Sequence, residues 1–352
     1  MTWIAATGIR AAFNARTGLL DGFTVEDEGR EVAPLHRAPW VGTGEVMPED
    51  AAPLMATLGG DFFCAPFASS EDGSPLHGWP PNSPWTVVAE GGGILRAVLN
   101  RPVQGATLVK ELAVAPGHPF VYQRHVFVGG TGRLSFANHA NVSLPSGGLI
   151  RTSPKSVWET PPTPLEGDPS RGRSALSCPA QAQNPRAFPG VSGPVDLTTY
   201  PWSPQHEDFV VGIEARGHPL GWTAVTRLGT GDLYLSLRDP SRVPMTMLWH
   251  SNGGRDYAPW SGRHRGCLGV EEGAADHMLG VSSEADLSGP GALALRPDGI
   301  AEVRHVIGAI AWPTGEGVAE IRAEGDTLTV RGEGGAERRL PVRAGFLPAS
   351  AV

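Results

Sequence analysis

Residues 107–128 read TLVKELAVAPGHPFVYQRHVFV, and this stretch indicates the fold class. Its first eight and last eight residues form two strand-like runs, with alternating or short apolar patterns, on either side of a segment that contains Pro and Gly. Residues 209–214, 233–237 and 303–310 have the same character, and amphipathic helical patterns are nearly absent. The sequence therefore predicts an all-β protein built from many short antiparallel strands.

The C-terminal part of the chain repeats this pattern in a compact form. Residues 319–323 alternate, residues 324–326 (Glu-Gly-Asp) have the composition of a tight turn, and residues 327–331 alternate again. Residues 338–342 follow as a third run. We expect a three-stranded meander to close the chain.

Composition favours a globular protein with a substantial core. The chain has 352 residues, of which 40% are hydrophobic and 18% charged, and its 47 Gly and 33 Pro are spread along the sequence. Residues 154–204 form a long stretch rich in Pro, Ser, Gly and Gln, with strand-like segments of similar character on both sides. We therefore predict one domain over residues 1–352 with a long loop insertion at about 154–204, in preference to two domains joined by a linker.

Charge and hydropathy narrow the expected partners. The net charge is −8 and no Lys/Arg run occurs, so neither nucleic acid nor an anionic membrane surface is an expected partner. Residues 1–6 lack a basic segment followed by an apolar one, and no stretch reaches the ~20 apolar residues of a membrane span. A cytoplasmic location is the expectation that follows.

The cysteines and the common catalytic motifs give little support to metal or nucleotide chemistry. Cys64, Cys178 and Cys267 are widely spaced and form no CxxC pattern, so we expect small buried hydrophobic side chains and neither a disulfide framework nor a zinc site. Residues 206–208 (His-Glu-Asp) resemble a fragment of a metal site, but the next histidine at ligand spacing is missing. No GxSxG, P-loop, GxGxxG or HExxH motif occurs. We predict no metal and no cofactor.

Three short polar stations along the chain suggest a site. The first runs from residues 59–61 (Gly-Gly-Asp) to residues 77–85, His-Gly-Trp-Pro-Pro-Asn-Ser-Pro-Trp. The second is Asn138-His139, near the end of a strand-like run, and the third is Gly269-Val270-Glu271, at the end of an apolar one. Each alone has an ordinary structural interpretation: a turn, a strand edge or a solvated acidic pair.

Taken in order, these stations resemble the aldose 1-epimerase (galactose mutarotase-like) superfamily. Its hexose-phosphate branch has His-Gly-Phe-Ala-Arg-x-Ser-Pro-Trp where this chain has residues 77–85, so the ends match and the family arginine falls on Pro81. Proline has no donor to offer, and Asp61 repels phosphate and accepts from hydroxyls. The resemblance implies a large antiparallel β-sandwich, the supersandwich, acting on a free, non-phosphorylated sugar.

The same resemblance implies roles for individual residues. Glu271 would be the general base, His139 the general acid on the ring oxygen, and His77 a hydrogen-bonding group that orients the same region. This chemistry needs an ionised Glu271 beside a charged His139, which mutual attraction should favour. A second set is expected to bind the sugar: Asp61, Asn82, Asp208 and Trp249.

Alternatives remain open from sequence. The chain could be a non-catalytic carbohydrate-binding protein, which the proline at position 81 would suit, or a carbohydrate lyase or hydrolase on a related supersandwich. A lyase would need a tyrosine base, for which Tyr257 is the candidate. Trp3 and Trp40 are candidates for an exposed patch that would make a homodimer.

Overall fold

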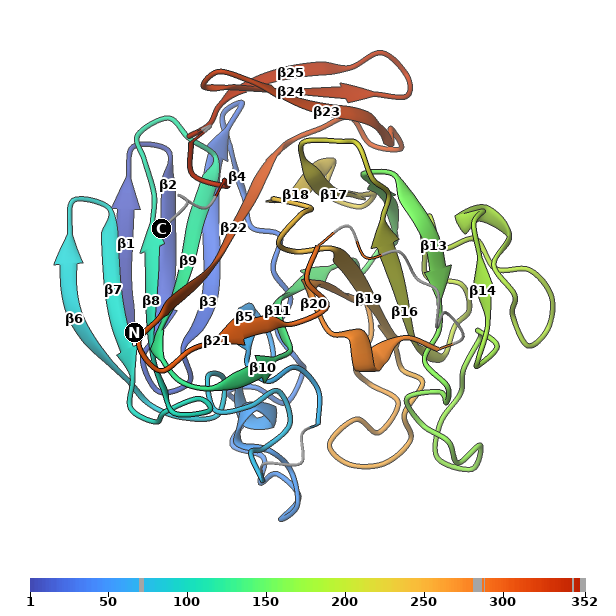
Figure 1. Ribbon diagram of the computed structural model, residues 1–352. Coiled ribbons are helices and arrows are strands. Elements are labelled where there is room, and N and C mark those ends of the chain that lie inside the picture. Colours follow the sequence, from blue (N-terminus) through green and yellow to red (C-terminus); the bar gives the residue numbers. More distant parts are fainter. Residues whose placement is uncertain (70–72, 281–286, 288, 344, 349–352) are drawn as a thin grey trace.

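Two large antiparallel β-sheets packed against each other form the framework of the protein, as seen in a computed structural model (Figure 1). The structure describes residues 1–69, 73–280, 287, 289–343 and 345–348. In this part of the chain the helices are three short 3₁₀ turns, η1 (Pro53–Thr57), η2 (Pro185–Ala187) and η3 (Asp276–Met278). The predicted all-β class is therefore confirmed.

The first sheet has eleven strands. In spatial order they are β1 (Thr2–Ala6), β2 (Ile9–Asn14), β3 (Leu19–Asp27), β5 (Asp61–Cys64), β11 (Phe136–Ser143), β20 (Cys267–Ala274), β19 (Met245–Asn252), β16 (His206–Glu214), β13 (Lys155–Glu159) and β14 (Gln181–Ala182), with β4 (Arg30–Val32) paired to β3. Its central strands come from distant parts of the chain, so residues far apart in sequence become neighbours there.

The second sheet has nine strands. They are β15 (Thr199–Tyr200), β12 (Gly148–Thr152), β17 (Gly221–Arg227), β18 (Asp232–Arg238), β22 (Ile300–Ala311), β9 (Phe120–Gly129), β8 (Ala106–Ala113), β7 (Ile94–Leu99) and β6 (Trp85–Gly91). A two-stranded sheet joins β10 (Gly132–Leu134) to β21 (Leu293–Leu295). The runs predicted at the start and end of residues 107–128 correspond to β8 and β9, which pair from Ala106 opposite Gly129 to Ala113 opposite Tyr122.

A three-stranded meander, β23 (Val318–Glu324), β24 (Thr327–Gly332) and β25 (Glu337–Pro341), lies at the top of Figure 1. It matches the closing meander expected from the sequence. Its apolar side chains, such as Leu328, pack with Trp222 and Leu235 on the outer face of the nine-stranded sheet. The second sheet is therefore covered on both faces.

The hydrophobic core divides into layers because both faces of both sheets are covered. One cluster fills the space between the two sheets, with members such as Phe63, Phe127 and Val270. Another lies on the outer face of the eleven-stranded sheet, with Phe62 and Met247 among its members. Strands β16, β19 and β20 are buried along their whole length, so their polar residues lie inside the protein together with their apolar ones.

Two expectations about surfaces and loops need correction. Trp40 is not an exposed residue, because its side chain is 2% exposed and its Nε1 donates to the Met55 carbonyl over 2.7 Å. Trp3, in contrast, is 60% exposed. Residues 154–204 are not purely loop, since they contribute β13 and β14 to one sheet and β15 to the other.

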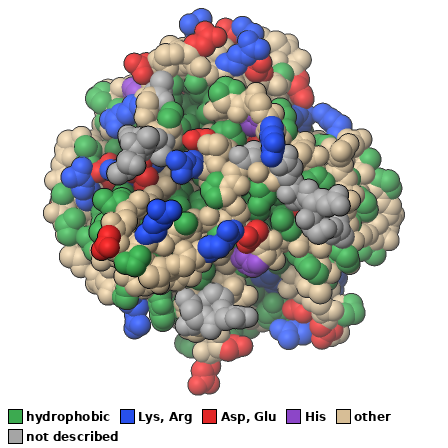
Figure 2. Space-filling view, viewed as in Figure 1, with side chains coloured by type: hydrophobic (Ala, Val, Ile, Leu, Met, Phe, Trp, Pro, Cys, Tyr) green, Lys and Arg blue, Asp and Glu red, His purple; other side chains and the backbone are tan. Residues whose placement is uncertain are grey.

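Acidic, basic and apolar side chains are interspersed on the face of the molecule that Figure 2 shows. No helix in the described part of the chain combines the length and the apolar character needed to cross a bilayer. Of the cysteines, Cys64 and Cys267 are buried as expected, whereas Cys178 is partly exposed.

Candidate active site

A pocket of about 820 Å³ opens on the outer face of the eleven-stranded sheet. Its lining combines aromatic rings with a few titratable groups, which is typical of small-molecule sites. The aromatic and titratable side chains in the lining include Phe62, His77, His139, Arg171, Phe209, Trp249, Arg255, Tyr257, Trp260 and Glu271. The loop of residues 253–266 supplies five of the lining residues: Arg255, Tyr257, Ala258, Pro259 and Trp260.

Strand register brings two of the stations together. Strands β11 and β20 pair antiparallel with His139 directly opposite Glu271, and β5 places Phe62 opposite His139 on the other side. Residues opposite each other in a pair project to the same face. The His139 Nε2 lies 3.2 Å from the Glu271 Oε1, and the Phe62 ring stacks on the imidazole at 4.3 Å between ring centroids.

His77 reaches the same pocket from a loop whose backbone is tightly constrained. Its φ of 68° lies in the left-handed region, which non-glycine residues rarely adopt. The Ala68 N–H donates to the His77 Nδ1 over 3.3 Å, so the other ring nitrogen, Nε2, holds the proton in the neutral ring. The His77 and His139 ring centroids are 5.4 Å apart. All three predicted proton-handling residues therefore lie in one pocket.

The electrostatics of this cluster differ from the expected ion pair. Burial raises the pKa of Glu271 well above its usual value and lowers the pKa of His139 well below its own. Burial also lowers the pKa of His77 to about 4. The free-energy cost of removing the two charged groups from water thus exceeds their mutual attraction, on which the expectation of an ion pair was based. Burial therefore favours the neutral form of each group, a protonated carboxyl on Glu271 and an uncharged imidazole on His139.

Trp249 lies in the pocket wall, as expected for a residue that would cover a sugar ring. Its indole meets the His139 ring edge to face at 5.9 Å, and its Nε1 donates to the Glu207 Oε1 over 2.6 Å. The indole is therefore fixed in orientation before any ligand enters.

Asp61 does not line this pocket. It precedes Phe62 on β5, so its carboxylate projects to the opposite face, between the two sheets, where it accepts from Gln123. Burial raises the pKa of Asp61 to about 6, while Gln123 and Lys110 act in the opposite direction. The predicted contact with a sugar does not fit this position, and Asp61 instead belongs to the polar contacts that join the sheets.

Asn82 also lies outside the pocket lining and supports it. Its Oδ1 accepts from the Leu54 N–H over 2.8 Å, and its Nδ2 donates to the carbonyls of Leu76 and Gly78. These bonds hold the loop of His77 against the η1 turn. Asn82 was expected to bind the substrate, but its hydrogen bonds instead position the loop that carries His77.

Asp208 faces away from the pocket, and its neighbour Glu207 faces it. The Asp208 carboxylate accepts from the backbone N–H groups of Ala175 and Leu176 and lies 3.0 Å from the His206 Nδ1. Glu207 accepts from Trp249 and from the Ser251 hydroxyl. Because side chains alternate along β16, Glu207 and Phe209 lie on the face of the sheet that carries the pocket and Asp208 lies on the other. Of these three residues, Phe209 lines the pocket.

Two arginines lie in the pocket lining, and no sequence pattern led us to expect them there. The Arg171 guanidinium lies over the Tyr257 ring at 4.2 Å, and that of Arg255 lies over the Trp260 ring at 4.5 Å. Each also lies near a carboxylate: the Arg171 Nε is 3.8 Å from the Glu166 Oε2, and the Arg255 Nε is 3.7 Å from the Glu207 Oε1. No local motif marks either residue, because both come from long irregular segments.

The overall structure is similar to solved structures of mutarotase-like proteins. A candidate aldose 1-epimerase from Escherichia coli K12 matches with a TM-score of 0.59 at 11% identity, covering 87% of this chain and 97% of that chain. A galactose mutarotase-like protein from Lactobacillus casei ATCC 334 matches with a TM-score of 0.55 at 10% identity, covering 88% and 99%. A galactose mutarotase related enzyme from Lactobacillus acidophilus gives 0.54 at 11% identity, covering 88% and 96%.

Comparison with protein-family models and with curated proteins found no match. At 10–11% identity, the structural similarity identifies the architecture and not the activity. The resemblance seen in the sequence is confirmed at that level: the chain has the galactose mutarotase-like fold.

Proposed function

We propose that this protein is an aldose 1-epimerase-like enzyme that interconverts the anomers of a free, non-phosphorylated sugar by general acid/base ring opening. The observation that supports it most directly is the 3.2 Å contact between His139 and Glu271 inside an aromatic pocket, with His77 beside them. A sugar ring offers apolar faces to Trp249 and hydroxyl groups to the polar side chains.

The number of protons held by the His139–Glu271 pair suits this reaction. Transfer of the single proton from Glu271 to the His139 Nε2 converts the neutral pair into a carboxylate and an imidazolium. Glu271 then removes the proton of the anomeric hydroxyl while His139 donates its proton to the ring oxygen, and the C1–O5 bond breaks. After rotation about C1–C2, the open-chain hydroxyl attacks the opposite face of the carbonyl carbon, and both protons return. No proton is gained or lost over the cycle.

His77 adds a fixed donor to this arrangement. With its Nδ1 occupied by the Ala68 N–H, its Nε2–H is available to hydrogen-bond an oxygen near the anomeric centre. Hydrogen bonds from a substrate to the charged forms of His139 and Glu271 would also offset part of the burial cost that keeps the pair neutral at rest. Substrate binding and charge separation are therefore coupled in this proposal.

The test is anomer exchange measured by NMR across a panel of aldoses, comparing wild type with Glu271→Gln. Because Arg171 and Arg255 lie in the lining, the panel includes uronic acids and aldose phosphates beside neutral sugars. We expect faster exchange for at least one sugar, and a loss of about 10²–10⁴-fold in the variant. Glu111→Gln, on the other sheet and paired with Arg96, is the matched control and should leave exchange unchanged.

Two outcomes would contradict the proposal. Sugar binding without faster exchange would favour a carbohydrate-binding protein, and unchanged exchange in Glu271→Gln would remove this residue from the mechanism. A lyase with Tyr257 as its base receives less support, because burial raises the pKa of Tyr257. Arg255 and Arg171 oppose this shift and Glu166 adds to it, and the net rise in the pKa disfavours a phenolate.

A further inference from the structure

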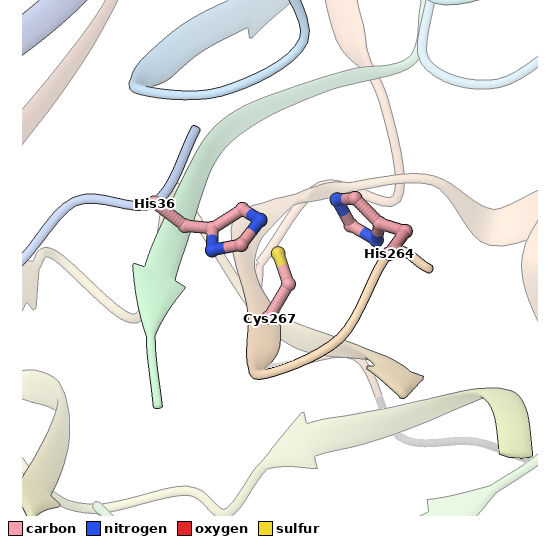
Figure 3. Close-up of side chains that lie close together, drawn as sticks. All are labelled: His36, His264 and Cys267. Carbon is pink, nitrogen blue, oxygen red and sulfur yellow. The ribbon is translucent and has the colours of Figure 1, made fainter. Parts of the chain in front are cut away.

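Three side chains with metal-binding atoms converge beside the pocket, and the proposed chemistry uses none of them. They are His36, on the segment after β4, His264, in the loop between β19 and β20, and Cys267, the first residue of β20. Their ligand atoms lie within 4.8 Å of one another. In Figure 3 the two imidazole rings lie on either side of the Cys267 thiol.

His264 is held so that one ring nitrogen is left free. The Ser251 hydroxyl donates to the Glu207 Oε2 over 2.9 Å, so its oxygen accepts from the His264 Nδ1 at 2.7 Å. That fixes the proton on Nδ1 and leaves a lone pair on Nε2. The His264 side chain is 1% exposed, and its Nε2 has no hydrogen-bond partner among the described residues.

His36 presents a second buried nitrogen of the same kind. Its Nε2 also lacks a partner within the described part of the chain, and its ring meets the His264 ring edge to face at 5.0 Å. A buried polar atom without a partner is destabilising, so two of them side by side need an explanation. A bound cation would satisfy both lone pairs at once.

The donor set identifies the class of cation. Two imidazole nitrogens and one cysteine sulfur suit zinc, which binds nitrogen at about 2.0–2.1 Å and sulfur at about 2.3 Å in tetrahedral sites. Such a site holds its ligand atoms about 3.4–3.6 Å apart, so a closure of about 1 Å would complete it. A further oxygen, Asn141 Oδ1, lies 3.8 Å from the Cys267 Sγ and could supply the fourth position. We propose that His36, His264 and Cys267 bind one Zn²⁺ ion.

The relay behind His264 supports the proposal independently. A histidine that ligates a metal usually donates its other N–H to a fixed acceptor that sets its tautomer and orientation. Ser251, itself anchored by the Glu207 carboxylate, has that role here. The sequence led to the expectation of no zinc site because the three cysteines are widely spaced and form no CxxC pattern. His264 and Cys267 are only three positions apart, but His36 lies more than two hundred residues away in the sequence.

Such a site would stabilise one wall of the pocket. His264 stacks on Trp249 at 5.4 Å with an interplanar angle of 13°, and it belongs to the loop that includes Arg255, Tyr257 and Trp260. The ion would connect this loop to β20 and to the segment of His36. Its role is then structural, and the proposal does not depend on the reaction assigned to Glu271.

The experiment uses the full chain, treated with a chelator and then titrated with Zn²⁺ or Co²⁺. We expect one equivalent to bind, a thiolate-to-cobalt charge-transfer band in the near ultraviolet, and a higher thermal midpoint with zinc. Cys267→Ala should abolish the band. Cys64→Ala, a buried cysteine in the same hydrophobic cluster, is the matched control and should retain it.

Two further variants address folding and positioning. His36→Gln changes a residue at the edge of the core and should remove binding while the protein stays folded. Ser251→Ala should weaken zinc binding by about 10–100-fold through the orientation of His264. Absence of the cobalt band in wild type, its survival in Cys267→Ala, or equal zinc affinity in folded His36→Gln would each overturn the proposal.

Discussion

The His139 imidazole and the Glu271 carboxyl share one proton at a place where neither group reaches bulk water. Their side chains are 3% and 2% exposed. Attraction at 3.2 Å favours the ion pair, whereas desolvation of two charges opposes it, and for fully buried groups desolvation is commonly the larger effect. In the proposed mechanism, hydrogen bonds from a polar ligand would offset this cost and allow the pair to separate charge.

This proton sharing predicts the pH dependence of turnover. The active form has one proton on the pair, so activity should fall on the alkaline side when that proton is lost and on the acid side when a second is added. Because the pKa of Glu271 is raised and that of His139 is lowered, the alkaline limb should lie above pH ~4.5 and the acid limb below pH ~6.5. The measurement is the pH profile of kcat/KM; an acid limb at pH ~6.5 would mean that His139 titrates as an exposed imidazole.

Gly78 determines the geometry of the His77 loop. Its φ is 76°, and a Cβ at this position would lie 2.1 Å from the Ala65 carbonyl oxygen. We expect Gly78→Ala to lower the free energy of unfolding by more than the ~1 kcal/mol that a left-handed alanine costs, and to displace His77. Chemical denaturation measures the first effect and anomer exchange the second.

Gly73 offers a matched control for that substitution. It has the same φ of 76° but nothing within 4 Å of an added Cβ. Gly73→Ala therefore carries the backbone cost without the steric clash. Equal losses of stability in the two variants would show that the close approach to Ala65 is unimportant.

Among the elements, β16 serves two parts of the protein at once. Its Glu207 side fixes Trp249 in the pocket wall, and its Asp208 side accepts from the backbone of the 174–176 segment. The alternation of a strand buried on both faces lets adjacent acids act in separate surroundings. The long segment that the sequence suggested as a loop is thereby attached to the centre of the sheet.

Asp208→Ala should detach this segment. It leaves the N–H groups of Ala175 and Leu176 without their acceptor, which we expect to lower the free energy of unfolding by about 1–3 kcal/mol and to speed proteolysis between residues 166 and 190. Asp168→Ala removes a comparable acceptor from an exposed turn and should have little effect. Similar proteolysis rates for both variants would contradict an anchoring role for Asp208.

At the scale of the whole molecule, the two sheets need cover on their outer faces. Loops and the pocket residues cover the eleven-stranded sheet, and the β23–β25 meander covers the nine-stranded one. The meander is therefore part of the core structure of the protein. Its inward face is apolar and its outward face is charged, as the period of two in the sequence indicated.

Leu328 tests this role because it is fully buried between the meander and the sheet. Leu328→Ala should lower the free energy of unfolding by about 2–5 kcal/mol through lost burial and a new cavity. Arg331→Ala, on the exposed face of the same strand, should cost less than about 1 kcal/mol, since surface ion pairs contribute little. Denaturant titration of both variants measures the difference, and equal losses would mean that the meander packs loosely.

The sequence by itself determined the all-β class, several strands and the closing meander, because alternation and turn residues are local signals. It also drew attention to His77, His139 and Glu271 through short motifs in a family order. The family resemblance, and not the local patterns, led to the expectation that they share one site. The residues of a strand do not, however, determine which other strands will pair with it.

Only the tertiary structure decided which side chains face the pocket and what charge they hold. Asp61 and Asp208 looked suitable in sequence, but on strands covered on both faces the polar pattern no longer reveals the orientation, and each proved to point away. The protonation of the His139–Glu271 pair depends on desolvation by surrounding residues that lie far apart in the sequence. His264 and Cys267 are close in sequence, but the approach of His36 to them depends on the tertiary fold, which short-range spacing does not encode.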